Sequence, residues 1–175
     1  MRRADVEEVF PLFHACFPEV SRQSLIDCQD WMLFYIHDDK AFCCVYPHEK
    51  GLIIQYAGVL PEYRGKGLPR QMLEQLRALY PGLDWYSECI PGSHALEALL
   101  RNGWSRVPIH YVCPAWGEEP EDRSLDLLVL PYGEQPQDVL GFLADFYRSG
   151  FQSTREDLIN SYRQELGQGD HTFLD

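Results

Sequence analysis

The residues best suited to chemistry lie in a short basic loop between an apolar run and a helical pattern. The segment YAGVLPEYRGKGLPRQMLEQL, residues 56–76, places Arg64, Lys66 and Arg70 around two glycines. Glycines let an anion approach the backbone closely, and a helix that begins there adds the unpaired N–H groups of its first turn. The loop is therefore predicted to bind a phosphate, with a basic turn at the start of a surface helix as the alternative.

Two common phosphate-binding motifs do not fit this loop. The P-loop pattern GxxxxGK[ST] is absent from the sequence. Gly65 and Gly67 supply the first two glycines of a dinucleotide fingerprint, but Arg70 stands at the third position. The GKG spacing alone is therefore weak evidence for a phosphate-binding site. The helices and strands predicted around the loop carry more information.

The charge balance restricts the partners of the chain. Its 175 residues include 27 acidic and 15 basic side chains, which give a formal net charge of −12. Nucleic-acid binding needs a basic surface that neutralises phosphates, so no nucleic-acid partner is expected. An acidic surface attracts a cationic substrate over long range, although simple solvation of the surface explains the charge equally well.

The cysteines and the N-terminal residues indicate the cellular compartment in which the protein is expected to work. None of the six cysteines forms a CxxC pair or stands at zinc spacing with a histidine, so we expect free thiols and no metal. The N-terminal basic residues are followed by Asp5 and Glu7 rather than by a long apolar core, which argues against a signal peptide. The expectation is a cytoplasmic protein that does not cross or bind a membrane.

Helical and strand patterns surround the loop. Apolar residues recur every three or four positions in 5–17 and 21–29, which predicts two helices with Asp5 and Ser21 near their starts. A meander, a helix that begins near Pro69, and a further set of strands and helices follow. The predicted segments are 31–37, 41–47 and 52–59 (strands), 69–80 (helix), 84–90 (strand), 93–104 (helix), 104–116 and 124–132 (an antiparallel ribbon), and 136–148 and 154–166 (helices).

Residues 59–76, VLPEYRGKGLPRQMLEQL, resemble motif A of the GNAT family of N-acetyltransferases. The family hallmark is Gln/Arg-x-x-Gly-x-Gly/Ala: Arg64 and Gly67 match it, and Pro69 departs from its last position. The order of helices and strands resembles that of the family over roughly residues 1–132. The segment ALEALLRNGW, 95–104, is similar to the second cofactor helix of the family.

The resemblance implies an α/β fold, the GNAT fold, with a mixed central sheet of about six to seven strands flanked by helices. Residues 1–133 would form the acetyltransferase domain, and residues 134–175 would form a C-terminal helical extension packed on the same domain. An apolar stripe that includes Val139, Leu143 and Phe146 fits core packing, with a homodimer contact or a lid over the acceptor site as alternatives.

The same resemblance implies an N-acetyltransferase that moves an acetyl group from acetyl-CoA to a primary amine by direct attack. The pantetheine arm would pair with the backbone of residues 58–60, and the pyrophosphate would lie on the amides of residues 64–71. The cofactor-binding residues would be Gly58, Val59, Leu60, Arg64, Gly65, Lys66, Gly67, Leu68, Pro69, Arg70, Gln71 and Ser93. The acceptor would be a small-molecule or peptidic amine, and a cationic one if the acidic surface steers it.

Glu88, Tyr56 and Tyr111 are the candidates for catalytic groups. A strand glutamate next to the expected cofactor cleft could act as general base, although a solvent-facing glutamate is the simpler explanation. Tyr56 could relay a proton, and Tyr111 could line the acceptor side. In the family the oxyanion donor is largely a backbone N–H, which would here belong to Val59 or Leu60.

Two departures from the family pattern support a second hypothesis. Pro69 removes one amide donor, and Leu99 stands where many family members carry a tyrosine that protonates the departing thiolate. The alternative is therefore a GNAT-fold chain that has lost catalysis and acts as a CoA-binding or protein-interaction module.

Overall fold

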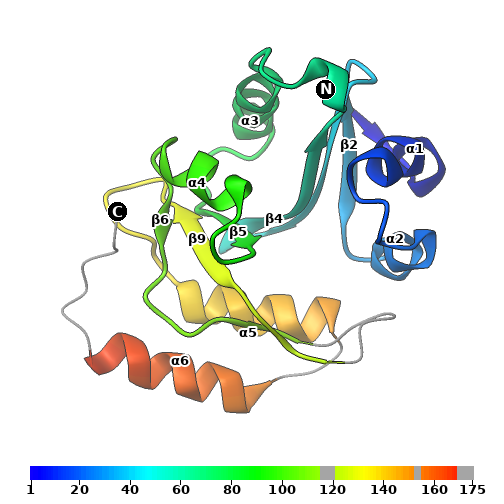
Figure 1. Ribbon diagram of the computed structural model, residues 1–175. Helices are drawn as coiled ribbons and strands as arrows, with labels where there is room; N and C mark the ends of the chain where they lie inside the picture. The colour runs from blue at the N-terminus through cyan, green and yellow to red at the C-terminus, as the bar shows by residue number, and fades with distance from the viewer. Residues whose placement is uncertain (115–120, 152–154, 169–175) are drawn as a thin grey trace. The chain divides into compact units, whose positions relative to one another are not determined.

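The computed structural model describes residues 1–114, 121–151 and 155–168 and divides into two compact units (Figure 1). Unit 1 is Met1–Pro47 with Ile54–Gly82, and unit 2 is His48–Ile53 with Leu83–Asp175. Within the described residues, a mixed sheet of seven strands has the order β1-β2-β3-β4-β5-β9-β6, and β7 pairs with β8. Helices α1 to α6 accompany the strands, the last two toward the C-terminus. The predicted α/β class, strand number and C-terminal helices are confirmed.

Unit 1 contains the first helices and strands and the basic loop. Its elements are β1 (Arg2–Ala4), α1 (Val6–Cys16), α2 (Arg22–Cys28), β2 (Leu33–His37), β3 (Ala41–His48) up to Pro47, β4 (Gly51–Val59) from Ile54, the 3₁₀ helix η1 (Pro61–Tyr63) and α3 (Leu68–Leu79). Strand β1 pairs with β2 but is not anticipated by the sequence pattern, because three residues are too few to show a period.

Local sequence explains the starts and turns of unit 1. Asp5 caps α1 as predicted, since its carboxylate accepts the amide of Glu8 at 2.9 Å while Glu8 accepts the amide of Asp5 at 3.1 Å. The hairpin of β2 and β3 turns at Asp38 and Asp39, whose φ angles of 51° and 52° suit a tight hairpin turn. Caps and turns of this kind depend on neighbouring residues, so they can be predicted from the sequence.

Helix α3 buries only part of its predicted apolar stripe. Leu68, Met72 and Leu76 are buried, whereas Leu79 is 53% exposed. Leu79 is the last residue of the helix, and the C-cap Tyr80 that follows it hydrogen-bonds Tyr35 through the two hydroxyl groups at 2.6 Å. Leu79 therefore lies outside the core although it continues the apolar spacing of the helix, because the chain turns away at this point.

Unit 2 contains the remaining strands and both C-terminal helices. Its elements are the start of β4, β5 (Trp85–Cys89), α4 (His94–Leu100), β6 (Ser105–Arg106), β7 (Val112–Cys113), β8 (Arg123–Ser124), β9 (Asp126–Leu130), α5 (Val139–Gly150) and α6 (Glu156–Gln168). The amides of Tyr132 and Gln137 both donate to the buried carboxylate of Asp84 at 2.8 Å, which anchors the connection from β9 to α5. The apolar stripe of α5 is buried, and its Phe142 stacks on Tyr86 at 4.6 Å between ring centroids.

The predicted antiparallel ribbon is broken into two short pairs. β6 pairs with β9, and β7 pairs with β8 in a separate sheet. Pro108 lies between β6 and β7, and a proline cannot donate a ladder hydrogen bond. The prediction of one continuous strand over 104–116 is therefore wrong between 107 and 111, and residues 115 and 116 lie outside the described residues.

Helix α4 is also shorter than predicted. It ends at Leu100 instead of Trp104, with Arg101 as its C-cap and a positive φ of 83° at Gly103. Residues 101–103 form a turn and do not continue the helix. Among the described residues, every helix is too short or too polar to span a bilayer.

Candidate functional site

The loop before α3 presents a cluster of unpaired backbone amides. Gly65 and Gly67 have φ angles of 75° and 76°, and a Cβ atom built on either would have nothing within 4 Å. Gly67 is the N-cap of α3 and has no side chain to cap the helix. Among the described residues, no acceptor lies within hydrogen-bond distance of the amides of Gly65, Lys66, Gly67, Leu68 and Arg70. We call these five amides the amide cradle; together with the positive end of the helix dipole they suit a bound anion.

The cradle is smaller than the predicted set of amides from residue 64 to residue 71. The amide of Arg64 donates to Pro61 at 3.3 Å, and the amide of Gln71 donates to Gly67 at 3.2 Å. Pro69 has no amide hydrogen, and because α3 begins at Leu68 it occupies the second helical position instead of the first. Arg64, Pro69 and Gln71 therefore offer no main-chain donor to an anion.

Two lysines add positive charge beside the cradle. The Lys40 and Lys66 ammonium groups lie 5.4 and 4.9 Å from the centroid of the Tyr63 ring. Within the described part of the chain, neither lysine has a carboxylate within 4 Å. The loop is therefore locally basic in a chain whose formal charge is −12.

The two arginines of the loop are engaged by the protein itself. Arg64 donates through Nε to the carbonyl of Val59 at 3.2 Å and also interacts with the Cys16 thiol. Arg70 donates through Nε to Glu74 at 2.9 Å, one turn further along α3. Their side chains thus support the end of β4 and the surface of α3, and of the two it is Arg70 that has a carboxylate partner.

The end of β4 limits the predicted role of residues 58–60. The amide of Leu60 donates to the carbonyl of Lys40 at 2.9 Å, so it is occupied and does not serve as the oxyanion donor. A Cβ atom on Gly58 would lie 2.6 Å from Cε1 of Phe42 and 2.9 Å from Sγ of Cys16. Close packing between β4 and α1 explains this glycine. Of the two predicted oxyanion donors, Val59 remains.

Tyr56 lies in an aromatic cluster of unit 1. Its ring meets Phe13 edge-on at 5.1 Å between centroids and Phe17 at 5.6 Å. The side chain is half-buried, as is Val59 nearby in the same strand. The cluster fixes the orientation of the phenol ring at the C-terminal end of β4.

Glu88 and Tyr111 of unit 2 are brought together by the fold. The Tyr111 hydroxyl donates a hydrogen bond to Oε1 of Glu88. Tyr111 is completely buried, and this burial together with the Glu88 charge raises the pKa of its phenol well above the usual value. Tyr111 therefore stays protonated and acts as a donor to Glu88.

Several solved structures resemble the fold of this chain. No protein-family model matches the sequence, and no curated protein matches it. A protein from Bacteroides thetaiotaomicron described as a GNAT-family acetyltransferase is 16% identical, covers 85% of this chain and 97% of its own, and has a TM-score of 0.68. The ribosomal-protein-S18-alanine N-acetyltransferase from Escherichia coli is 17% identical with a TM-score of 0.56, over 77% of this chain and 92% of its own. Diaminobutyrate acetyltransferase from Paenibacillus lautus, solved with its substrate and coenzyme A, is 14% identical with a TM-score of 0.53, over 77% and 95%.

The chain has the GNAT acetyltransferase fold. At these identities the likeness establishes the architecture and not the chemistry. The loop before α3 lies within residues 59–76, the segment whose sequence resembles motif A of the GNAT family.

Helix α4 overlaps the segment, residues 95–104, whose sequence resembles the second cofactor helix of the GNAT family. Ser93 is its N-cap, and the Ser93 hydroxyl oxygen accepts the amide of Leu96 at 3.2 Å. Leu99 is half-buried and brings no hydroxyl group to this helix. Ser93 therefore has a structural task already, and a general acid is not supplied from position 99.

Two tyrosines that sequence reasoning did not single out as site residues extend the Glu88 contact. Tyr147 on α5 and Tyr162 on α6 are buried, and their hydroxyl groups lie 3.2 Å apart. The Tyr111 ring stacks on Tyr147 at 6.4 Å and lies 6.1 Å from Tyr162. The aromatic stripe of the C-terminal segment was visible in the sequence, but its proximity to Glu88 depends on the fold of unit 2.

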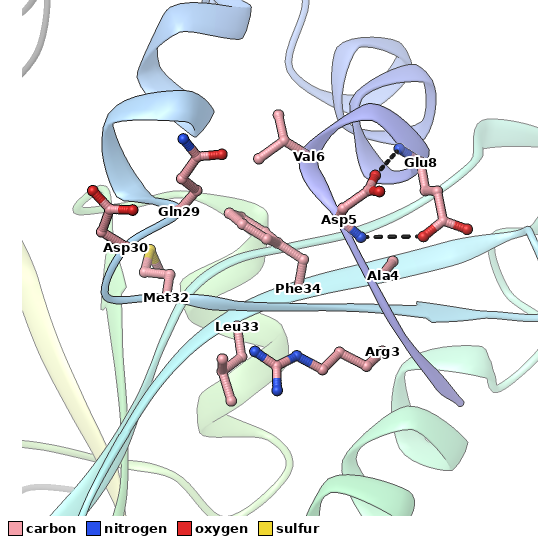
Figure 2. A pocket seen from close by; sticks show the side chains of 10 residues that line it. All are labelled: Arg3, Ala4, Asp5, Val6, Glu8, Gln29, Asp30, Met32, Leu33 and Phe34. Carbon is pink, nitrogen blue, oxygen red and sulfur yellow. Dashed lines mark hydrogen bonds between the residues drawn. The ribbon is translucent and has the colours of Figure 1, made fainter.

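A separate hollow of about 510 Å³ lies in unit 1, and none of the predicted site residues is among those that line it (Figure 2). Val6, Met32 and Phe34 give it an apolar lining, and Figure 2 shows the capping-box hydrogen bonds of Asp5 and Glu8 on one side. These two carboxylates are committed to the start of α1. Among the described residues there is also no group of three or more His, Cys, Asp or Glu side chains that could hold a metal ion.

Proposed function

We propose that this chain is an N-acetyltransferase that transfers an acetyl group from acetyl-CoA to a primary amine. The observation that carries the proposal is the amide cradle: five unpaired amides and two positive-φ glycines at the start of α3, in a chain with the GNAT fold. A phosphate group is the ligand that such a set of donors suits best.

The residues of the loop fit the pyrophosphate of coenzyme A. Open space above Gly65 and Gly67 lets two phosphates approach the amides, and Lys40 and Lys66 offset their charge. Pro69 lacks one donor, and a hydrogen bond to a charged group contributes about 1.5–3 kcal/mol. Binding is therefore expected to be weaker than with a full set of amides, at micromolar strength.

Acetyl-CoA supplies an activated acetyl group as a thioester. The chain itself must accept a proton from the amine, and we assign this task to the Glu88 carboxylate, which Tyr111 orients. The amide of Val59 is the proposed oxyanion donor, since that of Leu60 is occupied. With Leu99 in place of a tyrosine, we propose that water protonates the departing thiolate.

The acceptor is proposed to be a cationic small-molecule or peptidic amine. The formal charge of −12 favours the approach of cations. Both kinds of acceptor occur in the names of the fold neighbours, one of which acts on a ribosomal-protein alanine and another on diaminobutyrate. The six cysteines are free thiols, which fits the proposal that the protein works in the reducing cytoplasm.

Two observations favour a second candidate, a GNAT-fold module that binds acetyl-CoA or a protein partner without catalysis. The amide of Leu60 is occupied, and Pro69 withholds a donor from the cradle. Both changes weaken parts of the site that transfer would use, while the remaining amides still suit an anion.

Calorimetry and a thiol-release assay distinguish the candidates. We expect acetyl-CoA to bind with micromolar affinity and a panel of polyamines, aminoglycosides and basic peptides to contain at least one acetylated amine. Glu88→Gln should then reduce turnover about 10²–10⁴-fold without changing acetyl-CoA affinity, because it removes only the proton acceptor. Glu97→Gln, on the exposed face of α4, is the matched control and should behave as the wild type.

Three results of these experiments distinguish the transferase from the non-catalytic module. Absence of acetyl-CoA binding removes the transferase proposal. Binding without acetylation of any amine supports the module instead. Full turnover in Glu88→Gln would show that another group accepts the proton.

A further inference from the structure

The segment that carries Tyr111 is held by the two C-terminal helices. Pro108 interrupts the strand between β6 and β7, so residues 107–111 have no continuous ladder. Both main-chain polar groups of the next residue, Val112, contact phenols instead: its amide donates to the Tyr162 hydroxyl at 2.8 Å, and its carbonyl accepts from Tyr147 at 3.0 Å. Phenols of α5 and α6 thus hydrogen-bond the main chain at the start of the short strand β7.

The hydrogen bonds lead from the C-terminal helices to the Glu88 carboxylate. Tyr162 on α6 and Tyr147 on α5 are hydrogen-bonded to each other and to Val112, and α5 and α6 lie side by side in Figure 1. The ring of Tyr111 packs against both phenols, and its hydroxyl donates to Glu88 on β5. We call Tyr111, Tyr147 and Tyr162 the tyrosine network.

We propose that the tyrosine network positions Glu88 for catalysis, so that α5 and α6 are part of the machinery that readies the general base. This inference rests on the proposed function, in which Glu88 accepts the proton of the amine. Tyr111 holds Oε1, which orients the second carboxylate oxygen toward the proton it accepts. A glutamate side chain loses considerable rotamer freedom when it is fixed, and the network supplies that order before substrate arrives.

Titratable neighbours of Glu88 stay neutral near pH 7, so the titration of Glu88 can be measured without interference from them. The titratable groups of unit 2 that interact with it electrostatically include Tyr111, Tyr147 and Cys89. Burial raises the pKa of Cys89 to about 11 and the pKa values of both phenols above their usual range, so these three stay neutral near pH 7. The nearby Asp126, which also faces Cys89, has Arg106 as its ion-pair partner at 3.6 Å.

Hydroxyl-deletion variants test the proposal because they keep the packed rings. In Tyr111→Phe we expect kcat to fall about tenfold with the KM for acetyl-CoA unchanged, which corresponds to the loss of one hydrogen bond to a charged group. A hydrogen bond to a carboxylate lowers its pKa, so its removal should raise the Glu88 pKa. Carbon-13 NMR of the Glu side chains, assigned with Glu88→Gln, measures this pKa without any substrate.

Two further variants complete the design. Tyr162→Phe lies at the far end of the network and should reduce kcat about two- to fivefold, because it removes the hydrogen bonds to Val112 and Tyr147 but leaves that between Tyr111 and Glu88 in place. Tyr35→Phe is the matched control: its hydroxyl is also buried and bonded to a second phenol, that of Tyr80 at 2.6 Å, but it lies in unit 1. It should lower the melting temperature and leave both kcat and the Glu88 titration unchanged.

The results decide between positioning and mere stability. If Tyr111→Phe and Tyr162→Phe lower the melting temperature as Tyr35→Phe does while kcat and the Glu88 pKa stay at wild-type values, the inference is overturned. If the wild type transfers no acetyl group, the proposed function fails, whereas the NMR titration still reports whether Tyr111 governs Glu88. Should Tyr111→Phe fail to fold, Tyr162→Phe carries the same test.

Discussion

The amide cradle of unit 1 and the tyrosine network of unit 2 are built in opposite ways. The cradle uses exposed main-chain amides around Gly65 and Gly67, and almost none of its chemistry depends on buried side chains. The network uses buried phenols that come from three separate segments. The first is local in sequence and the second is not.

This difference determines what each region tolerates. Side chains in the cradle loop can change with little effect on stability, provided that the two glycines keep their positive φ. In the network each ring fills core volume and each hydroxyl satisfies a partner, so a change affects stability as well as chemistry. Substitutions can therefore test the contrast directly.

The largest expected effect comes from removing a ring of the network. Tyr147→Ala should lower the free energy of unfolding by about 3–5 kcal/mol, since it leaves a cavity in the core of unit 2. Urea denaturation measures this loss. Tyr132→Ala removes a ring that is 65% exposed and should cost no more than about 0.5 kcal/mol. Equal losses in the two variants would contradict the assignment of Tyr147 to the core.

The next effect concerns the backbone of the cradle. Gly67→Val forces a β-branched residue into a φ of 76° and should displace at least two amides, which would weaken acetyl-CoA binding about 100-fold. Gly82→Val imposes the same strain at a φ of 80° beyond the other end of α3. Calorimetry should show unchanged affinity for this control. Loss of binding in both variants would point to general unfolding and not to the cradle.

A third prediction separates the packing glycine from the cradle glycines. Gly58→Ala should destabilise the protein by about 1–3 kcal/mol, because the added Cβ would overlap the side chains of Phe42 and Cys16. A Cβ on Gly133 would meet nothing within 4 Å, so Gly133→Ala should be neutral or slightly stabilising. Thermal unfolding of the two variants measures the difference, and a neutral Gly58→Ala would show that β4 and α1 pack less closely.

The smallest expected effect is a gain in the cradle. Pro69→Ala restores an amide donor in the first turn of α3 and should tighten acetyl-CoA binding about tenfold. Pro81→Ala, just after the same helix, restores no donor in the cradle and should leave affinity unchanged. Identical affinities for Pro69→Ala and the wild type would mean that the amide at position 69 does not face the anion.

The sequence was informative wherever the deciding interactions are local. Helix starts at Asp5 and Ser21, the turn at Asp38 and Asp39, and the glycine loop before α3 follow from residues within a few positions of each other. The order of elements resembled the GNAT pattern, and the solved structures confirm that fold. Local rules require no knowledge of distant segments, so a linear pattern can express them.

Tertiary contacts decided the finer points of both sites. The Leu60 amide is occupied by Lys40, and the Arg64 side chain turns to Val59, although motif A would assign both residues to the cofactor. Tyr111 meets Glu88 only because segments 23 residues apart converge, and the phenols that hold it follow still later in the chain. The sequence by itself determined a GNAT-like frame and a glycine-rich basic loop that we predict to bind an anion. Which donors are available and which carboxylate is held were decided by packing, because a hydrogen bond formed at long range leaves no period or spacing in the chain.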